Sequence, residues 1–354
     1  MLHGHRMLKI IALVSLAVVI FLFLSANKNY EEVVLNFSHN SNDLAGSLIL
    51  PKGIDKPSAV ALFVHGDGAM PYDAYGYYRP LWQALAEKGI ASFSWNKAGI
   101  SASTGNWQNQ SMDDRADEVI AAIEALKYHK DIKFNTIGLI GYSQAGWVMP
   151  LVASKSDYPD FMVIVSGAIN WMEQGEYLTK TRLEKAGFSQ QQIEEALNGD
   201  MHISTILPRE SSYDDYLELY EDSYSTALKT AKTPMSADRF QFAKLNWQYD
   251  ARRNLKDIDC PTLAMFGEDD KNVDIANSVE VYQEIFSESG KASFDIKTYL
   301  STQHGMLKSQ YFDEISPGLW SAIKLEVLGS KAFADGYLEF VADWIDEKSH
   351  SQRQ

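Results

Sequence analysis

The feature that most constrains the fold is a regular alternation of short, unbroken apolar runs with longer amphipathic segments. The run from 59 to 64 is apolar at every position, which is typical of a strand covered on both faces. The segment from 111 to 128 instead places Val119, Ile120 and Ile123 at helical spacing. This alternation predicts an α/β fold, with a mostly parallel central sheet and helices on both faces. The predicted strands are 59–64, 90–95, 136–141, 161–165, 262–266 and 294–299, and the predicted helices are 78–88, 111–128, 144–153, 275–286 and 334–345.

Two segments depart from this alternation. Residues 33–37 and 44–50 have the pattern of two strands joined in a hairpin by a polar turn. Between 170 and 255 there is no convincing buried strand, and the segment is rich in Glu, Gln, Tyr and Lys with helical patches. We interpret 170–255 as a helical insertion rather than a second domain, which leaves 30–169 and 256–350 as the core.

The N-terminus is a separate element. Arg6 and Lys9 precede an apolar run from Ile10 to Leu24, interrupted by Ser15, which predicts that residues 1–29 are a signal peptide or a signal anchor. Leu24 would occupy the position three residues before the cut, where cleavage requires a small side chain, so a retained anchor is favoured. Because the positive charge precedes the run, the remaining chain is expected beyond the membrane. The protein is therefore predicted to be membrane-anchored or secreted, in the periplasm if the source is Gram-negative.

The composition argues against several classes of partner. The formal net charge of −15 argues against nucleic acid, because a protein that grips phosphates needs a basic face. Cys260 is the single cysteine, so no intrachain disulfide can form. No Cys/His spacing suggests a metal site, and we expect no cofactor.

The stretch Gly141-Tyr-Ser-Gln-Ala-Gly146 joins a predicted strand to a predicted helix and places Ser143 at the junction. A serine there projects from the carboxyl edge of the sheet, where ligands bind in open α/β sheets. The helix that follows directs its amide groups toward developing negative charge. The usual pattern is Gly-x-Ser-x-Gly, and Ala145 replaces the second glycine. Alanine adds only one methyl group, so we expect the turn to be retained; a plain strand-to-helix turn is the competing interpretation.

Two later loops supply the partners that a nucleophilic serine needs. Asp270 follows the predicted strand 262–266, with Asp269 as its close competitor, and a carboxylate there can accept an imidazole N–H. His304 is the one histidine on a loop after a late predicted strand. The order Ser, Asp, His, each after a strand, predicts a triad in which Ser143 attacks, His304 takes its proton and Asp270 orients the imidazole.

Acyl transfer also needs backbone donors for the oxyanion. The Gln144 amide, next to the nucleophile, is one candidate. The other should come from the loop after strand 59–64, where we favour the Asp67 amide over that of Gly68. His65 is expected to brace this loop.

Through these residues, the chain resembles the α/β-hydrolase family over roughly residues 31–348. It is most similar to bacterial serine esterases and acyl hydrolases of the dienelactone-hydrolase and serine-aminopeptidase-like branches. Their N-terminal hairpin is matched by Leu44–Gly53, their HG-x-G oxyanion loop by His65–Gly68, and their Gly-x-x-Asp-x-x-Val acid loop by Gly267–Val273, which favours Asp270 over Asp269. The resemblance implies that 170–255 forms a lid over the active site.

The chain departs from this family at the oxyanion side of the site. Asn96 and Ala98 stand where the family commonly carries Asp and Arg. This puts in doubt an ion pair that supports the loop at 96–105. Asp67 stands where a small residue is commoner. Its carboxylate would oppose the charge of an oxyanion unless it points away.

The favoured function is a serine hydrolase that cleaves a carboxylic ester through an acyl-enzyme intermediate, with a small ester or acyl compound as substrate. Peptide-bond and thioester cleavage use the same machinery and stay open. A membrane-anchored binding protein with a decayed hydrolase fold is a third hypothesis, motivated by Asp67, Ala145 and the altered loop at 96–101. The many aromatic side chains of 170–255 either line an acyl pocket or pack the insertion onto the core.

Overall fold

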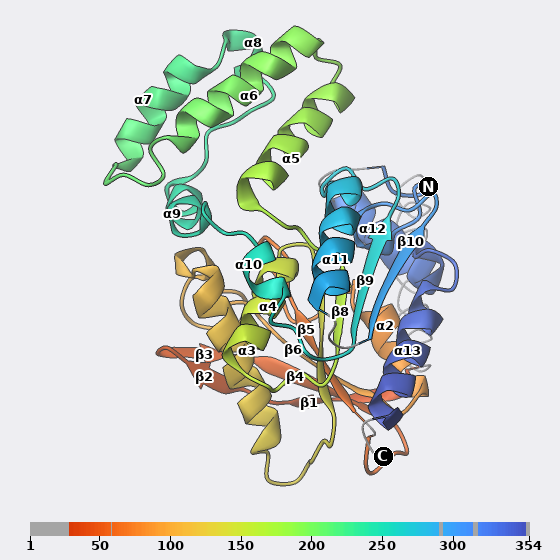
Figure 1. Cartoon of the computed structure of the whole chain (residues 1–354). Coiled ribbons are helices and arrows are strands. Elements are labelled where there is room, and N and C mark those ends of the chain that lie inside the picture. Colours follow the sequence, from red (N-terminus) through yellow and green to blue (C-terminus); the bar gives the residue numbers. More distant parts are fainter. Residues whose placement is uncertain (1–27, 58, 290–292, 314–317, 352–354) are drawn as a thin grey trace, which may run out of the picture.

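The computed structural model describes residues 28–351 except 58, 290–292 and 314–317. The described residues include an eight-stranded sheet of order β1-β4-β6-β5-β7-β8-β9-β10 (Figure 1). The six strands from β6 to β10 in this order are parallel, and β1 and β4 are antiparallel at one edge. The predicted α/β fold is therefore confirmed. The strands are β1 (Tyr30–Val34), β4 (Gly46–Pro51), β5 (Val60–Val64), β6 (Ala91–Trp95), β7 (Ile137–Tyr142), β8 (Met162–Val165), β9 (Thr262–Gly267) and β10 (Phe294–Tyr299).

The N-terminal hairpin is longer than predicted and is interrupted. Pairing passes from β1 and β4 to a small ribbon, β2 (Phe37–His39) and β3 (Asn42–Leu44), in one register, with Val34 opposite Ser47 and Phe37 opposite Leu44. At the interruption, two backbone groups bond outside the hairpin ladder. The Gly46 N–H donates to the Asn36 side chain at 3.2 Å, and the Ala45 carbonyl accepts from the Asn96 N–H.

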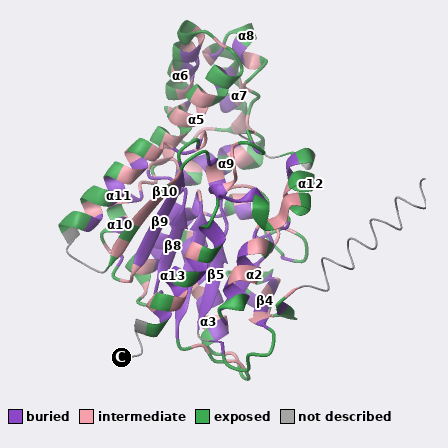
Figure 2. Ribbon diagram, turned by 90° about the vertical axis from the view of Figure 1, so that its right-hand side faces the viewer, coloured by how far each residue is buried: buried purple, intermediate pink, exposed green. Residues whose placement is uncertain are grey.

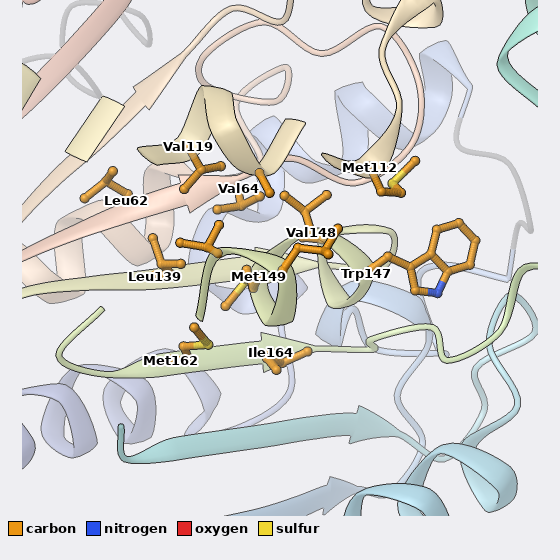
Figure 3. Packing of buried hydrophobic residues seen from close by; sticks show 14 of the residues in the cluster. Leu62, Val64, Met112, Val119, Leu139, Trp147, Val148, Met149, Met162 and Ile164 are labelled. Carbon is orange, nitrogen blue, oxygen red and sulfur yellow. The ribbon is translucent and has the colours of Figure 1, made fainter. Parts of the chain in front are cut away.

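Helices cover both faces of the sheet (Figure 2). Residues of β5 alternate between two cores: Val60, Leu62 and Val64 pack on one face, and Ala61 and Phe63 on the other. Because both cores are closed to water, the strand is apolar throughout. Figure 3 shows Val148 and Met149, from the helix that follows β7, beside strand residues such as Leu139 and Met162. The first face carries α3 (Met112–Lys127), α4 (Ala145–Lys155) and α11 (Ile275–Ser289), and the second carries α2 (Arg79–Glu87) and α13 (Tyr337–Ser351).

Helix α12 (Leu319–Leu328) was not predicted from the sequence, and it follows the loop that carries His304. Three short 3-10 helices complete the described elements of the core: η1 (Trp107–Asn109), η2 (His304–Met306) and η3 (Gly329–Ala332).

Between β8 and β9 the chain forms a helical layer, which Figure 1 shows above the sheet. This layer has its own apolar cluster, which includes Tyr216, Tyr220, Tyr224 and Phe240. These aromatic rings therefore pack against one another within the layer. Its helices are α5 (Trp171–Lys185), α6 (Gln190–Ser204), α7 (Tyr213–Ser223), α8 (Thr226–Lys229), α9 (Ala237–Asn246) and α10 (Arg252–Leu255).

The predicted anchor lies almost wholly in residues 1–27, outside the described residues. Within the described ranges, no helix has the length and apolar character needed to cross a bilayer.

Candidate active site

Ser143 lies between the end of β7 and the start of α4, in the left-handed region with φ of 55°. A non-glycine residue there is strained, and such strain is common at active sites. The Ser143 N–H donates to the Val165 carbonyl at 2.9 Å, which fixes the turn to the neighbouring strand. Ser143 is partly exposed, while Tyr142 and Gln144 on either side are buried. The turn therefore presents the serine side chain outward from the carboxyl edge of the sheet.

Close packing explains which small residues this turn needs. A Cβ on Gly146 would lie 2.7 Å from the Gly167 Cα, so α4 can approach the sheet only with glycine there. A Cβ on Gly141 would lie 2.6 Å from the Ala145 Cβ. Ala145 itself is fully buried and fits. The second glycine that the turn requires is thus Gly146, one position later than in the usual pattern.

The structure brings His304 and Asp270 together. His304 Nδ1 lies 2.8 Å from Asp270 Oδ2, and since a carboxylate can only accept, the imidazole carries its proton on Nδ1. The Asp270 side chain is fully buried, and its other oxygen accepts the backbone N–H groups of Asn272 (2.8 Å) and Val273 (3.0 Å). Asp269 is exposed and accepts instead from Ser309 Oγ. Of the two candidates, Asp270 is therefore the one that contacts the histidine.

Tyr77 connects the serine turn with the histidine loop. Its hydroxyl donates to the Gly305 carbonyl, and its ring packs edge-on against Tyr142 with 5.3 Å between ring centres. The residue after His304 and the residue before Ser143 thus contact one side chain. No hydrogen bond joins Ser143 Oγ to His304 among the described residues, so Tyr77 is the contact that relates the two loops.

His65 braces the loop after β5. Its Nε2 donates to the Trp95 carbonyl at 2.6 Å, and its Nδ1 accepts from the Tyr78 hydroxyl at 3.0 Å. Burial lowers the pKa of His65 to about 3, so the ring is neutral at pH 7. A neutral, doubly bonded ring with no free nitrogen is suited to support and not to proton transfer.

Two buried basic side chains also hold the same loop. Lys97 Nζ donates to the carbonyls of Gly66 (2.9 Å) and Gly68 (3.0 Å), and burial holds the pKa of this lysine well below its usual range. Arg115 donates to the His65 carbonyl at 2.6 Å and to the Gln144 side chain. Lys97 thus connects the loop at 96–105 with the loop after β5.

Lys97 and Arg115 occupy the backbone carbonyls of residues 65, 66 and 68. The backbone amides next to the nucleophile turn differ, because they include groups without a protein partner. In the described part of the chain, the backbone N–H groups of Asp67 and Gln144 donate to no protein group. The Gly68 amide bonds the Asp67 carboxylate. Asp67 and Gln144 are thus among the amides left available for a ligand oxygen.

The Asp67 carboxylate is paired with a residue of the helical layer. Arg239 on α9 donates from both guanidinium nitrogens to the two carboxylate oxygens, each at 2.8 Å. Burial would raise the pKa of Asp67, but the charge and hydrogen bonds of Arg239 outweigh this, and the pKa is lowered. Gln144 Nε2 also lies 3.4 Å from the same carboxylate.

The first helix of the layer contacts the acid loop. Gln174, Tyr177 and Thr181 lie on one face of α5, and they donate to three successive carbonyls of residues 270–272. The Tyr177 hydroxyl lies 2.9 Å from the Asp270 carbonyl. The helical layer therefore contacts both the loop of Asp67 and the loop of Asp270.

A family model described as serine aminopeptidase, S33 matches residues 55–310, which is more than half of the chain. The chain belongs to this α/β-hydrolase family. The predicted family is thereby confirmed, and the protein is a hydrolase of the α/β-hydrolase type. No curated protein matches the hydrolase significantly.

Solved structures share the fold of the hydrolase at low sequence identity. An esterase of Pyrococcus furiosus is 15% identical, with 90% of each chain covered and a TM-score of 0.52. The esterase Est1E of Butyrivibrio proteoclasticus, with bound ferulic acid, is 14% identical, with 90% of this chain and 98% of that chain covered and a TM-score of 0.52. A proline iminopeptidase of Mycobacterium smegmatis is 14% identical, with 90% and 100% covered and a TM-score of 0.55. At this identity these likenesses establish the fold alone.

Sequence reasoning missed four residues of the site: Tyr77, Lys97, Arg115 and Arg239. Three of them reach across 29 or more residues of sequence to their partners, and Arg239 reaches across 172. A helical arginine is common on a surface, so Arg239 carried no local signal.

Proposed function

We propose that the protein is a serine esterase. Ser143 attacks the acyl carbon of a carboxylic ester while His304 takes its proton, and Asp270 holds the imidazole in the required tautomer. The amides of Asp67 and Gln144 bind the oxyanion. Water then hydrolyses the acyl-enzyme, with His304 as the base.

The observation that carries this proposal is the 2.8 Å contact between His304 and Asp270. It fixes the Nδ1–H tautomer, which leaves Nε2 as an acceptor for a serine proton. The strained backbone of Ser143 and the two available amides supply the nucleophile and the donors that such an imidazole serves.

An ester is favoured over a peptide with a free amino terminus because a substrate ammonium group needs a carboxylate partner. Asp67 is paired with Arg239 and Asp270 with His304. A peptidase is nevertheless a second candidate, because the family model carries the description serine aminopeptidase. Thioester cleavage by the same residues is a third.

A substrate panel tests this function. We expect the full-length protein to hydrolyse p-nitrophenyl esters faster than aminoacyl-nitroanilides or acyl-CoAs, and to be labelled by a fluorophosphonate. Faster cleavage of anilides or acyl-CoAs would replace the esterase by a peptidase or a thioesterase. Ligand binding with neither turnover nor labelling would instead favour the binding protein.

We also propose that residues 170–255 form a lid over the site and that residues 1–29 anchor the protein, with the catalytic domain outside the cytoplasm. The contacts of α5 and α9 with the acid and oxyanion loops support the lid.

The apolar run from Ile10 to Leu24 supports the anchor. We expect the protein to stay with membranes in alkaline carbonate and to be released by detergent; release by carbonate alone would contradict the anchor.

A further inference from the structure

We infer that Arg239 is a positioning residue of the oxyanion site, which neutralises the Asp67 carboxylate and holds the Asp67 backbone toward the reaction centre. This inference rests on the proposed function, because it assigns an oxyanion role to the Asp67 amide. Arg239 lies on α9, in the helical layer, and acts through Asp67 without touching the reacting atoms.

The physical problem is that one oxyanion donor carries a negative charge of its own. The loop lies against the nucleophile turn, since a Cβ on Gly66 would be 3.4 Å from the Ser143 Cβ. A carboxylate on the next residue would repel the negative oxygen that forms on the acyl carbon. A free Asp67 would therefore weaken the stabilisation that its own amide provides.

Arg239 answers this problem by its geometry. The two terminal nitrogens of its guanidinium group each donate to one oxygen of the Asp67 carboxylate at 2.8 Å. Such a bidentate ion pair is strong and directional. The guanidinium also lies over the rings of Phe242 (5.0 Å) and Trp171 (5.9 Å). The ring of Trp171 in turn packs on Trp147 of α4 at 5.2 Å. Arg239 is thus held by a group of aromatic rings that extends to the helix after Ser143.

Arg239 holds a part of the loop after β5 that Lys97 and Arg115 do not contact. Lys97 and Arg115 hold the carbonyls of residues 65, 66 and 68, and none of these contacts reaches the Asp67 side chain. Gln144 contacts Asp67 at 3.4 Å and is itself bonded by Arg115. The pair of Arg239 and Asp67 therefore adjoins both residues that carry the available amides.

Paired substitutions separate charge neutralisation from simple packing. We expect Arg239→Gln to lower kcat about 100-fold with little change in KM, the size of effect seen when one oxyanion donor is lost. Asp67→Asn removes the harmful charge and should cost less. The double variant Arg239→Gln/Asp67→Asn should therefore be faster than Arg239→Gln alone and close to Asp67→Asn. Fluorophosphonate labelling rates should follow the same order.

Arg252→Gln is the matched control, because Arg252 also makes a forked pair, with Glu173, in the same helical layer (3.2 and 2.9 Å). It should leave kcat unchanged. A double variant as slow as Arg239→Gln would overturn the inference, as would a rise in KM alone, which would make Arg239 a substrate-binding residue. Absence of labelling in the unmodified protein would instead defeat the proposed function.

Discussion

Replacing Ser143 with alanine is expected to lower kcat roughly 10⁴- to 10⁶-fold, the range found when a serine nucleophile is removed. Alanine differs from serine only by the hydroxyl, so the strain at φ of 55° is about the same in both, and the fold and the melting temperature should be unchanged. Fluorophosphonate labelling should disappear with the activity. Steady-state kinetics on a p-nitrophenyl ester, with labelling of the same sample, measures both.

Ser166→Ala is the matched control for this experiment. Ser166 follows the neighbouring strand β8, is also in the left-handed region with φ of 49°, and is fully buried. Activity and labelling should survive this change. Labelling that persists in Ser143→Ala would show that the nucleophile lies elsewhere and would remove the basis of the proposed mechanism.

Replacing Asp270 with asparagine is expected to lower kcat about 10⁴-fold with little change in KM. The asparagine oxygen can still accept the amides of Asn272 and Val273, so the acid loop should keep its shape. Its NH₂ group would then face His304 Nδ1 and force the proton onto Nε2. An imidazole in that tautomer cannot take the proton of Ser143, which is the reason for the large loss.

Asp269→Asn tests whether this effect belongs to the one carboxylate that contacts the histidine. Asp269 is exposed and contacts Ser309, so its replacement should change kcat only slightly. The ¹⁵N shifts of His304 should report proton transfer from Nδ1 to Nε2 in Asp270→Asn alone. Equal losses in the two variants would contradict the assignment of Asp270.

The core of the fold was predictable because its signals are local. A strand covered on both faces must be apolar at every position, and a helix on the sheet must be apolar at every third or fourth. These periods were visible for β5 and α3. Helix α12 was missed, although its sequence is strongly apolar, because an apolar segment without a clear polar face gives no periodic signal.

Parts of the candidate site followed from the same local signals. Parallel strands end at one edge, so residues that follow β7, β9 and β10 had to lie near one another there. The contact of His304 with Asp270 is consistent with that expectation. The choice between Asp270 and Asp269 needed the resemblance to a family, because adjacent residues of a loop differ in direction and not in chemistry.

By itself, the sequence determined the layered fold, the family and the edge of the sheet at which Ser143, Asp270 and His304 would lie, because each depends on neighbours within a few residues. Only the tertiary structure decided how the oxyanion loop is held. Lys97, Arg115 and Arg239 reach this loop from the end of β6, from α3 and from α9, respectively, and such pairings depend on how distant elements pack. An arginine on a helix looks the same in sequence whether it meets water or, as Arg239 does, a carboxylate of a distant loop.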